Sequence, residues 1–61
     1  MRILIADDHA LFRDGLSMQL EKIAPNATIL QTGTYSQTIK MLNSDKGVNL
    51  ILLDLDMADM E

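Results

Sequence analysis

The sequence predicts an α/β domain built on a parallel β-sheet. Short apolar runs at residues 2–6, 28–32 and 48–53 have the length and aliphatic content of β-strands. They alternate with two segments, residues 10–24 and 35–42, in which apolar residues recur with the period of an α-helix. Because consecutive strands that are joined through helices run parallel with right-handed crossovers, we expect a β-α-β-α-β chain.

Length and composition limit what the chain can be. Its 61 residues allow one small domain, and the lack of cysteine excludes disulfide bonds and thiolate metal clusters. Nine acidic residues against five basic ones give a net charge of -4, which argues against a nucleic-acid-binding surface in this segment. No signal peptide and no apolar run of membrane-spanning length is visible, so we expect a cytoplasmic chain with no membrane partner.

The first helical segment carries an apolar face that we expect to pack on the sheet. Its members follow helical spacing, with Leu11 beside them: Phe12, Leu16, Leu20 and Ile23. Arg13 and Ser17 fall largely on the opposite side. Gly15 costs about 1 kcal/mol against alanine inside a helix, and close packing on the sheet is one possible reason for it. Pro25 ends the segment.

The second helical segment has a recognisable start. Thr34 and Gln37 fit a capping box, in which two side chains satisfy backbone donors of the first turn reciprocally. The spacing predicts that Tyr35, Ile39 and Leu42 face inward.

The last apolar run leads directly into a carboxylate. Four consecutive aliphatic residues at 50–53, typical of a strand buried on both faces, precede Asp54. Asp7 and Asp8 end the first strand in the same way. Because open α/β sheets bind ligands at the carboxyl ends of their strands, these acids converge if the two strands are neighbours. Such a group of hard oxygen ligands suits Mg²⁺.

A plainer interpretation of the acids stays open. Asp7 and Asp8 could simply cap the first helix, with Asp54 capping whatever follows it. His9 fits a polar residue that opens the first helix. For Asp59 and Glu61 the alternative is a solvated acidic tail.

These residues resemble a known family. The Asp7-Asp8 pair after a first strand, with Asp54 ending a third, resembles the receiver domain of two-component response regulators. The string at residues 6–16, ADDHALFRDGL, is similar to the LuxR-type transcriptional subfamily. The resemblance implies a three-layer, flavodoxin-like receiver fold with strand order 2-1-3-4-5. Residues 1–61 then match its N-terminal half, a sheet truncated to order 2-1-3.

The resemblance also implies roles for single residues. Asp54 matches the phosphoacceptor, which attacks a phosphohistidine on a sensor histidine kinase and assists its own phosphorylation without being a turnover enzyme. Asp8 matches a direct Mg²⁺ ligand, and Asp7 matches the acid that orients a metal-bound water. The backbone carbonyl of Asp56 matches the third protein ligand. His9 has no catalytic counterpart.

Departures from the family pattern lead to further expectations. Ala58 follows Met57 where the family usually has proline, which leaves the loop after Asp54 less constrained. The family's switch Ser/Thr, its lysine and a helix-turn-helix output domain lie beyond residues 1–61, so we expect little stable phosphorylation of this chain alone. Any DNA contact would belong to that C-terminal domain. In the order 2-1-3, residues 50–53 form an exposed edge, which predicts a homodimer through that strand or a domain swap.

Two other classes of function are weighed against the receiver. A phosphorylation-independent interaction or dimerisation module would use the same scaffold without the metal. A haloacid-dehalogenase-like phosphohydrolase would use Asp54 and Asp56 as its D-x-D motif, but that family has Thr or Val at the position of Ala58 and leaves Asp7 and Asp8 unexplained.

Overall fold

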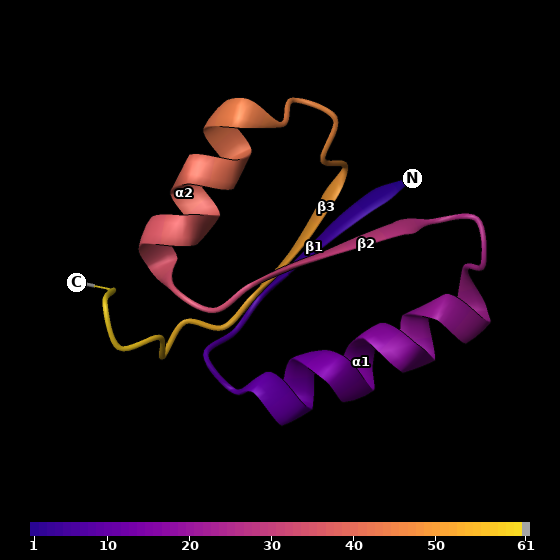
Figure 1. Cartoon of the computed structure of the whole chain (residues 1–61), viewed down its shortest axis with the longest axis horizontal. Coiled ribbons are helices and arrows are strands. Elements are labelled where there is room, and N and C mark those ends of the chain that lie inside the picture. The colour runs from indigo at the N-terminus through magenta and orange to yellow at the C-terminus, as the bar shows by residue number, and fades with distance from the viewer. Residues whose placement is uncertain (61) are drawn as a thin grey trace.

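The structure is a computed structural model that describes residues 1–60. The chain alternates strands and helices in the expected order: β1 (Arg2–Ala6), α1 (Ala10–Ile23), β2 (Thr28–Thr32), α2 (Tyr35–Ser44) and β3 (Leu50–Leu53). The strands form one parallel sheet in the order β2-β1-β3, and the two helices lie on opposite sides of it (Figure 1). The predicted three-layer architecture, truncated to order 2-1-3, is confirmed.

The core is centred on β1, because this strand has a neighbour on each side. Residues 3–6 are all buried, and Leu4 is fully enclosed with 0% of its surface exposed. The register pairs Ala6 with Thr32 on one side and with Leu53 on the other. The carboxyl ends of all three strands therefore reach the same edge of the sheet.

The predicted inner face of α1 is only partly correct. Leu16 and Leu20 are half-buried, but Phe12, Leu11 and Ile23 are 57%, 89% and 77% exposed. The buried residue of this helix is Ser17, whose Oγ accepts a hydrogen bond from Gln31 Nε2 at 2.8 Å. The reason is that α1 packs over β1 and β2, which turns its Ser17 side toward the sheet.

The start of α2 is as predicted, but its inner face is only partly so. Thr34 Oγ1 accepts from the amide of Gln37 at 3.1 Å, while Gln37 Oε1 accepts from Gly33 rather than from Thr34 itself. Tyr35 and Ile39, expected inside, are 38% and 39% exposed, whereas Leu42 is half-buried. The buried residue is Thr38, whose hydroxyl lies 2.7 Å from that of Thr32 on β2.

β3 lies at one edge of the sheet, and apolar side chains are exposed on both of its faces. Leu50, Ile51 and Leu53 are 43%, 39% and 42% exposed, so this strand is not the strand buried on both faces that its composition suggests. It follows the expectation for an edge strand in the 2-1-3 order. An open groove of about 350 Å³ runs beside it, with Phe12 and Leu16 of α1 in its lining.

Replacing Gly15 by alanine should raise the free energy of unfolding by about 0.5–1 kcal/mol. A Cβ built on Gly15 meets no atom of the described residues within 4 Å, so close packing does not explain the glycine. Its φ is negative, as alanine requires. Urea unfolding of the two proteins measures the difference, and a destabilised variant would contradict it.

Candidate functional site: an acidic cluster at the carboxyl edge of the sheet

The sheet register brings two acidic segments together. Asp7 follows β1 and donates its amide to the carbonyl of Thr32 at 3.1 Å. Asp54 follows β3 and donates its amide to the carbonyl of Ala6 at 2.8 Å. Each acid thus extends its strand by one ladder bond, and the two leave the sheet side by side. The predicted convergence of these segments is present in the structure.

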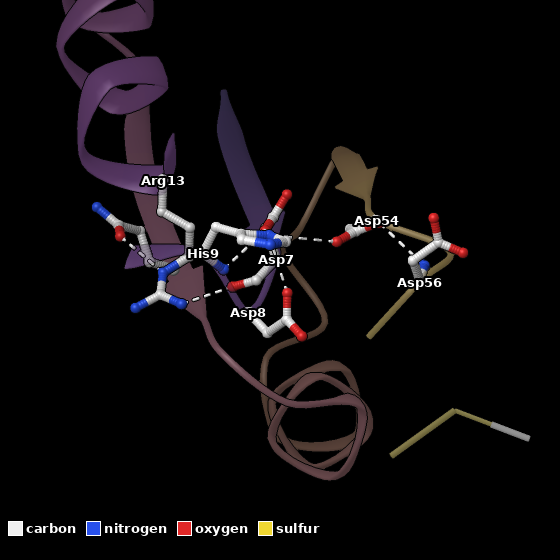
Figure 2. A network of polar contacts seen from close by, with 7 residues as sticks. Asp7, Asp8, His9, Arg13, Asp54 and Asp56 are labelled. Carbon is white, nitrogen blue, oxygen red and sulfur yellow. Dashed lines mark hydrogen bonds and ion pairs between the residues drawn. The ribbon is translucent and has the colours of Figure 1, made fainter. Parts of the chain in front are cut away.

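Four side chains meet at this edge. Asp7, Asp8, His9 and Asp54 each offer one potential ligand atom, and these atoms all lie within 4.8 Å of one another. Figure 2 shows the His9 ring lying among the three carboxylates. Three of the four groups provide carboxylate oxygens, the ligand type that Mg²⁺ prefers. The donor set therefore fits a small, hard divalent cation.

His9 is paired with the carboxylates around it. Its Nδ1 lies 2.8 Å from Asp7 Oδ1, 3.0 Å from Asp8 Oδ1 and 3.8 Å from Asp54 Oδ2. The hydrogen bond to Asp7, supported by the charges of Asp8 and the other acids, raises the pKa of His9. The backbone amide of His9 also donates to Asp7 Oδ1 at 2.8 Å and, as the main cause, lowers the pKa of Asp7.

These contacts decide against simple helix capping. His9 stands at the N-cap position of α1, but its side chain makes no capping hydrogen bond. Asp7 accepts from the amide two residues on, a local turn bond at the strand end. Neither Asp7 nor His9 therefore has helix capping as its side-chain role.

His9 should titrate with a pKa above about 6.5, and replacing Asp7 by asparagine should move that pKa back down. Because folding raises this pKa, the stability that the pairing contributes is present below about pH 6.5. It is lost as the pH rises through the folded-state pKa. NMR titration of the imidazole measures the shift, with Asp14→Asn as a control of equal charge change. An unshifted imidazole would contradict the geometry.

Asp54 and Asp56 are linked within one turn. Asp54 Oδ1 accepts from the amide of Asp56 at 2.9 Å, while Oδ2 faces the imidazole (Figure 2). The side chain of Asp56 is exposed, in keeping with a residue expected to act through its backbone. The role of the Asp56 carbonyl as a metal ligand stays a prediction.

Arg13 belongs to this site although the helical pattern assigned it to the outer side of α1. Its Nη1 donates to the carbonyl of Asp7 at 2.5 Å, and its Nε donates to Gln31 Oε1 at 3.2 Å. A Cβ at Gly33 would come within 2.9 Å of the same guanidinium, so the glycine leaves room for it. Arg13 thus holds the backbone of the acid pair against β2. In the sequence, its position one helical turn after His9 was the feature that could have placed Arg13 near the acid pair.

Asp59 was also missed. A solvated acidic tail was one alternative for this residue, but its carboxylate accepts hydrogen bonds from the amides of Tyr35 at 2.7 Å and Ser36 at 3.0 Å, at the start of α2. The tail interpretation is therefore wrong for Asp59. Glu61, for which the same alternative stands, lies outside the described residues. No local sequence pattern predicts a contact between residues that are more than twenty positions apart in the chain.

Comparison with known proteins gives two curated relatives. The chain is 36% identical over 61 residues to the Detocs response regulatory protein DtcB of Enterobacter cloacae (strain JD6301). The chain is similar to a response regulator. The second relative, a glycerol metabolism activator of Pseudomonas putida, is 34% identical over 59 residues. No protein-family model and no solved structure matches the chain.

The two similarities cover 100% and 97% of this chain but only 41% of the response regulatory protein and 27% of the glycerol metabolism activator. The chain therefore spans less than half of the length of the curated relatives that it matches. Together with the β2-β1-β3 sheet, the similarity supports a receiver-like domain. None of the described helices is both long and apolar enough to cross a lipid bilayer.

Proposed function

We propose that the chain is the phosphoacceptor part of a response-regulator receiver, in which Asp54 takes a phosphoryl group from a sensor histidine kinase with the help of Mg²⁺. The observation that supports this most directly is the meeting of Asp7, Asp8 and Asp54 at one point. Two separate strands contribute to it, and the atoms lie close enough for one cation to contact all three. A response regulatory protein among the relatives supports the same class of function.

The chemistry asked of the chain is a single phosphoryl transfer. A carboxylate oxygen of Asp54 attacks the phosphorus of a phosphohistidine, the P–N bond breaks, and the imidazole leaves with its electron pair. A bound Mg²⁺ would supply positive charge for the phosphoryl oxygens. Asp7, Asp8, the Asp54 carboxylate and the Asp56 carbonyl would hold that ion.

The remaining residues orient the acceptor. The amide of Asp56 holds Asp54 Oδ1, which leaves Oδ2 directed at the cluster. Arg13 fixes the backbone of Asp7, and the ladder bond to Ala6 fixes that of Asp54. Asp54 is itself modified when it accepts the phosphoryl group, so we assign the chain as a phosphoacceptor rather than as a turnover enzyme. A rival phosphohydrolase would turn over an aryl phosphate.

The wider role follows from the resemblance and the relatives. We assign the chain to the LuxR-type transcriptional subfamily on the residue 6–16 string, and place it in the cytoplasm with its kinase. In a longer protein it would control transcription through a separate DNA-binding domain. The word activator in the name of one relative supports such a role.

Titration of the chain with Mg²⁺ tests the proposal. We expect localised NMR shifts at the amides of Asp8, Asp54 and Asp56. Any acyl phosphate formed with a small phosphodonor should map to Asp54 by mass spectrometry and be absent from Asp54→Asn. A scaffold that only mediates interactions would show no localised metal response, and that result would refute the receiver assignment.

We also propose that the 61-residue chain forms a homodimer, through β3 or by exchange of elements. The open edge of β3 has unpaired backbone groups beside exposed aliphatic side chains, a combination that recruits another strand. Sedimentation at micromolar concentration should show a dimer or higher species. Ile51→Lys on β3 should shift it toward monomer, because a charge on an edge strand opposes pairing.

Ile23→Lys provides the matched control for that experiment. Ile23 is 77% exposed at the end of α1, a helix that packs over β1 and β2. The same substitution there should leave the association unchanged. A wild-type chain that is folded and monomeric at micromolar concentration would contradict the dimer.

A further inference from the structure

We infer that Asp59 is a positioning residue for the loop that carries Asp54 and Asp56, tying that loop to the start of α2. The inference rests on the proposed function, because the loop is where the phosphoacceptor and a predicted metal ligand lie. Asp59 uses both carboxylate oxygens: Oδ1 accepts from the amide of Tyr35 at 2.7 Å and Oδ2 from that of Ser36 at 3.0 Å. In Figure 1 the yellow segment that follows β3 lies beside the start of α2.

The loop needs anchors of this kind because its own hydrogen bonds do not fix its position. Residues 54–60 form no helix or strand, and none of them is proline, so no ring restricts their backbone. Its internal hydrogen bonds are local ones, from the amide of Asp56 to Asp54 Oδ1 and from that of Met60 to the carbonyl of Met57. Local bonds of this kind set turns but do not place the loop against the rest of the fold.

Asp59 and the nearby Met57, two residues before it, provide that placement. Met57 is 3% exposed and anchors the middle of the loop in the core. At the other end, the amide of Asp54 is held in the sheet by the carbonyl of Ala6. Asp56 lies between the sheet and these two anchors, so the direction of its peptide group depends on all three.

The start of α2 is well suited to hold a carboxylate. The first amides of a helix lack partners within the helix, and the positive end of the helix dipole lies there. Thr34 Oγ1 accepts a hydrogen bond from the amide of Gln37. The Asp59 carboxylate accepts from the amides of Tyr35 and Ser36, the two residues before Gln37. These donated bonds, that of Ser36 first, lower the pKa of Asp59, so the carboxylate is charged at neutral pH.

The anchor itself is firmly attached to the sheet. Thr38 on α2 is buried, and its hydroxyl bonds both to Thr32 on β2 at 2.7 Å and to the carbonyl of Thr34 at 2.8 Å. The tie therefore runs from the loop through the first turn of α2 to the central layer. It connects the loop after β3 to β2, the strand at the opposite edge of the sheet. None of the contacts in this connection involves the acidic cluster.

A tie to the loop and a plain helix cap predict different results, and three variants separate them. Asp59→Ala removes the tie, and Asp59→Asn keeps one acceptor oxygen of the two. Thr34→Ala is the matched control, because it removes a cap from the same helix turn and costs about 1 kcal/mol while leaving the Asp59 contacts in place. Urea unfolding of each variant sets the stability reference.

The first measurement is hydrogen exchange at the amide of Asp56 without Mg²⁺. Asp59→Ala should speed exchange beyond what its loss of global stability accounts for, Asp59→Asn should be intermediate, and Thr34→Ala should follow global stability alone. The second is the Mg²⁺ dissociation constant, which Asp59→Ala should raise by up to about 10-fold, the lower limit for loss of an outer-shell partner, because Asp59 acts on the ligands only through the loop. Thr34→Ala should leave it unchanged.

The outcomes can be told apart. Equal exchange at Asp56 in Asp59→Ala and Thr34→Ala would overturn the tie and leave Asp59 as a helix cap. If Asp59→Ala fails to fold, the comparison of Asp59→Asn with Thr34→Ala decides the question in the same way. A wild-type chain without a Mg²⁺ response at Asp8 and Asp54 would refute the proposed function. The metal-free exchange at Asp56 would still support or overturn the tie.

Discussion

Replacing Asp8 by asparagine should weaken Mg²⁺ binding at least about 10-fold. Loss of an outer-shell partner already costs about 10–100-fold in metal affinity, and a direct ligand should cost no less. Asp8 also provides one of the three carboxylates in the cluster, so its neutralisation removes a third of the local negative charge. Calorimetric titration, or the Mg²⁺-dependent shift of the Asp54 amide, measures the change.

Asp14 provides the control for that experiment. It is an exposed residue of α1 outside the cluster, and Asp14→Asn makes the same change in net charge. This variant should bind Mg²⁺ as the wild type does. Equal weakening by both substitutions would show that binding reflects net charge rather than a site at Asp8.

Replacing Leu4 by alanine should remove about 2–5 kcal/mol from the free energy of unfolding. Leu4 is fully buried in the central strand, where the lost side chain leaves a cavity that neighbouring strands cannot fill. A domain of this length has roughly 3–9 kcal/mol of stability at the usual value per residue, so the substitution should remove a large fraction of the total and lower the urea midpoint markedly. Circular dichroism during urea unfolding measures the effect.

Leu11→Ala is the matched control, since Leu11 is 89% exposed on α1. Its effect should stay within about 0.5 kcal/mol, as for most surface positions. A loss at Leu11 as large as the loss at Leu4 would mean that the helix face exposed in the monomer is covered in solution. Sedimentation of the same samples would identify that case.

Much of this fold could be predicted because its signals are local. The aliphatic runs, the helical spacing and the stop at Pro25 depend on neighbours within a few residues, and all five elements formed where these patterns lie. The third strand is shorter than the predicted 48–53, because the paired residues begin at Leu50. The meeting of Asp7 and Asp54 was predictable as soon as their two strands were taken as neighbours.

The faces of the helices were less predictable. Apolar spacing places Phe12 and Ile23 on one stripe of α1, but which stripe faces the sheet depends on which strands the helix covers. Here α1 covers β1 and β2, so Arg13 and Ser17 face inward and bond to Gln31. Their polar side chains are accommodated at the margin of the core because each finds a hydrogen-bond partner there.

By itself the sequence determined the order of elements, the parallel sheet and the acids that meet at its carboxyl edge. These depend on periodicity, on chain connection and on the position of Asp7, Asp8 and Asp54 at strand ends. The tertiary structure alone decided that His9 pairs with the acids and that Asp59 holds α2. Directional contacts of this kind form only after packing has brought distant residues within about 3 Å, and no local pattern encodes that approach.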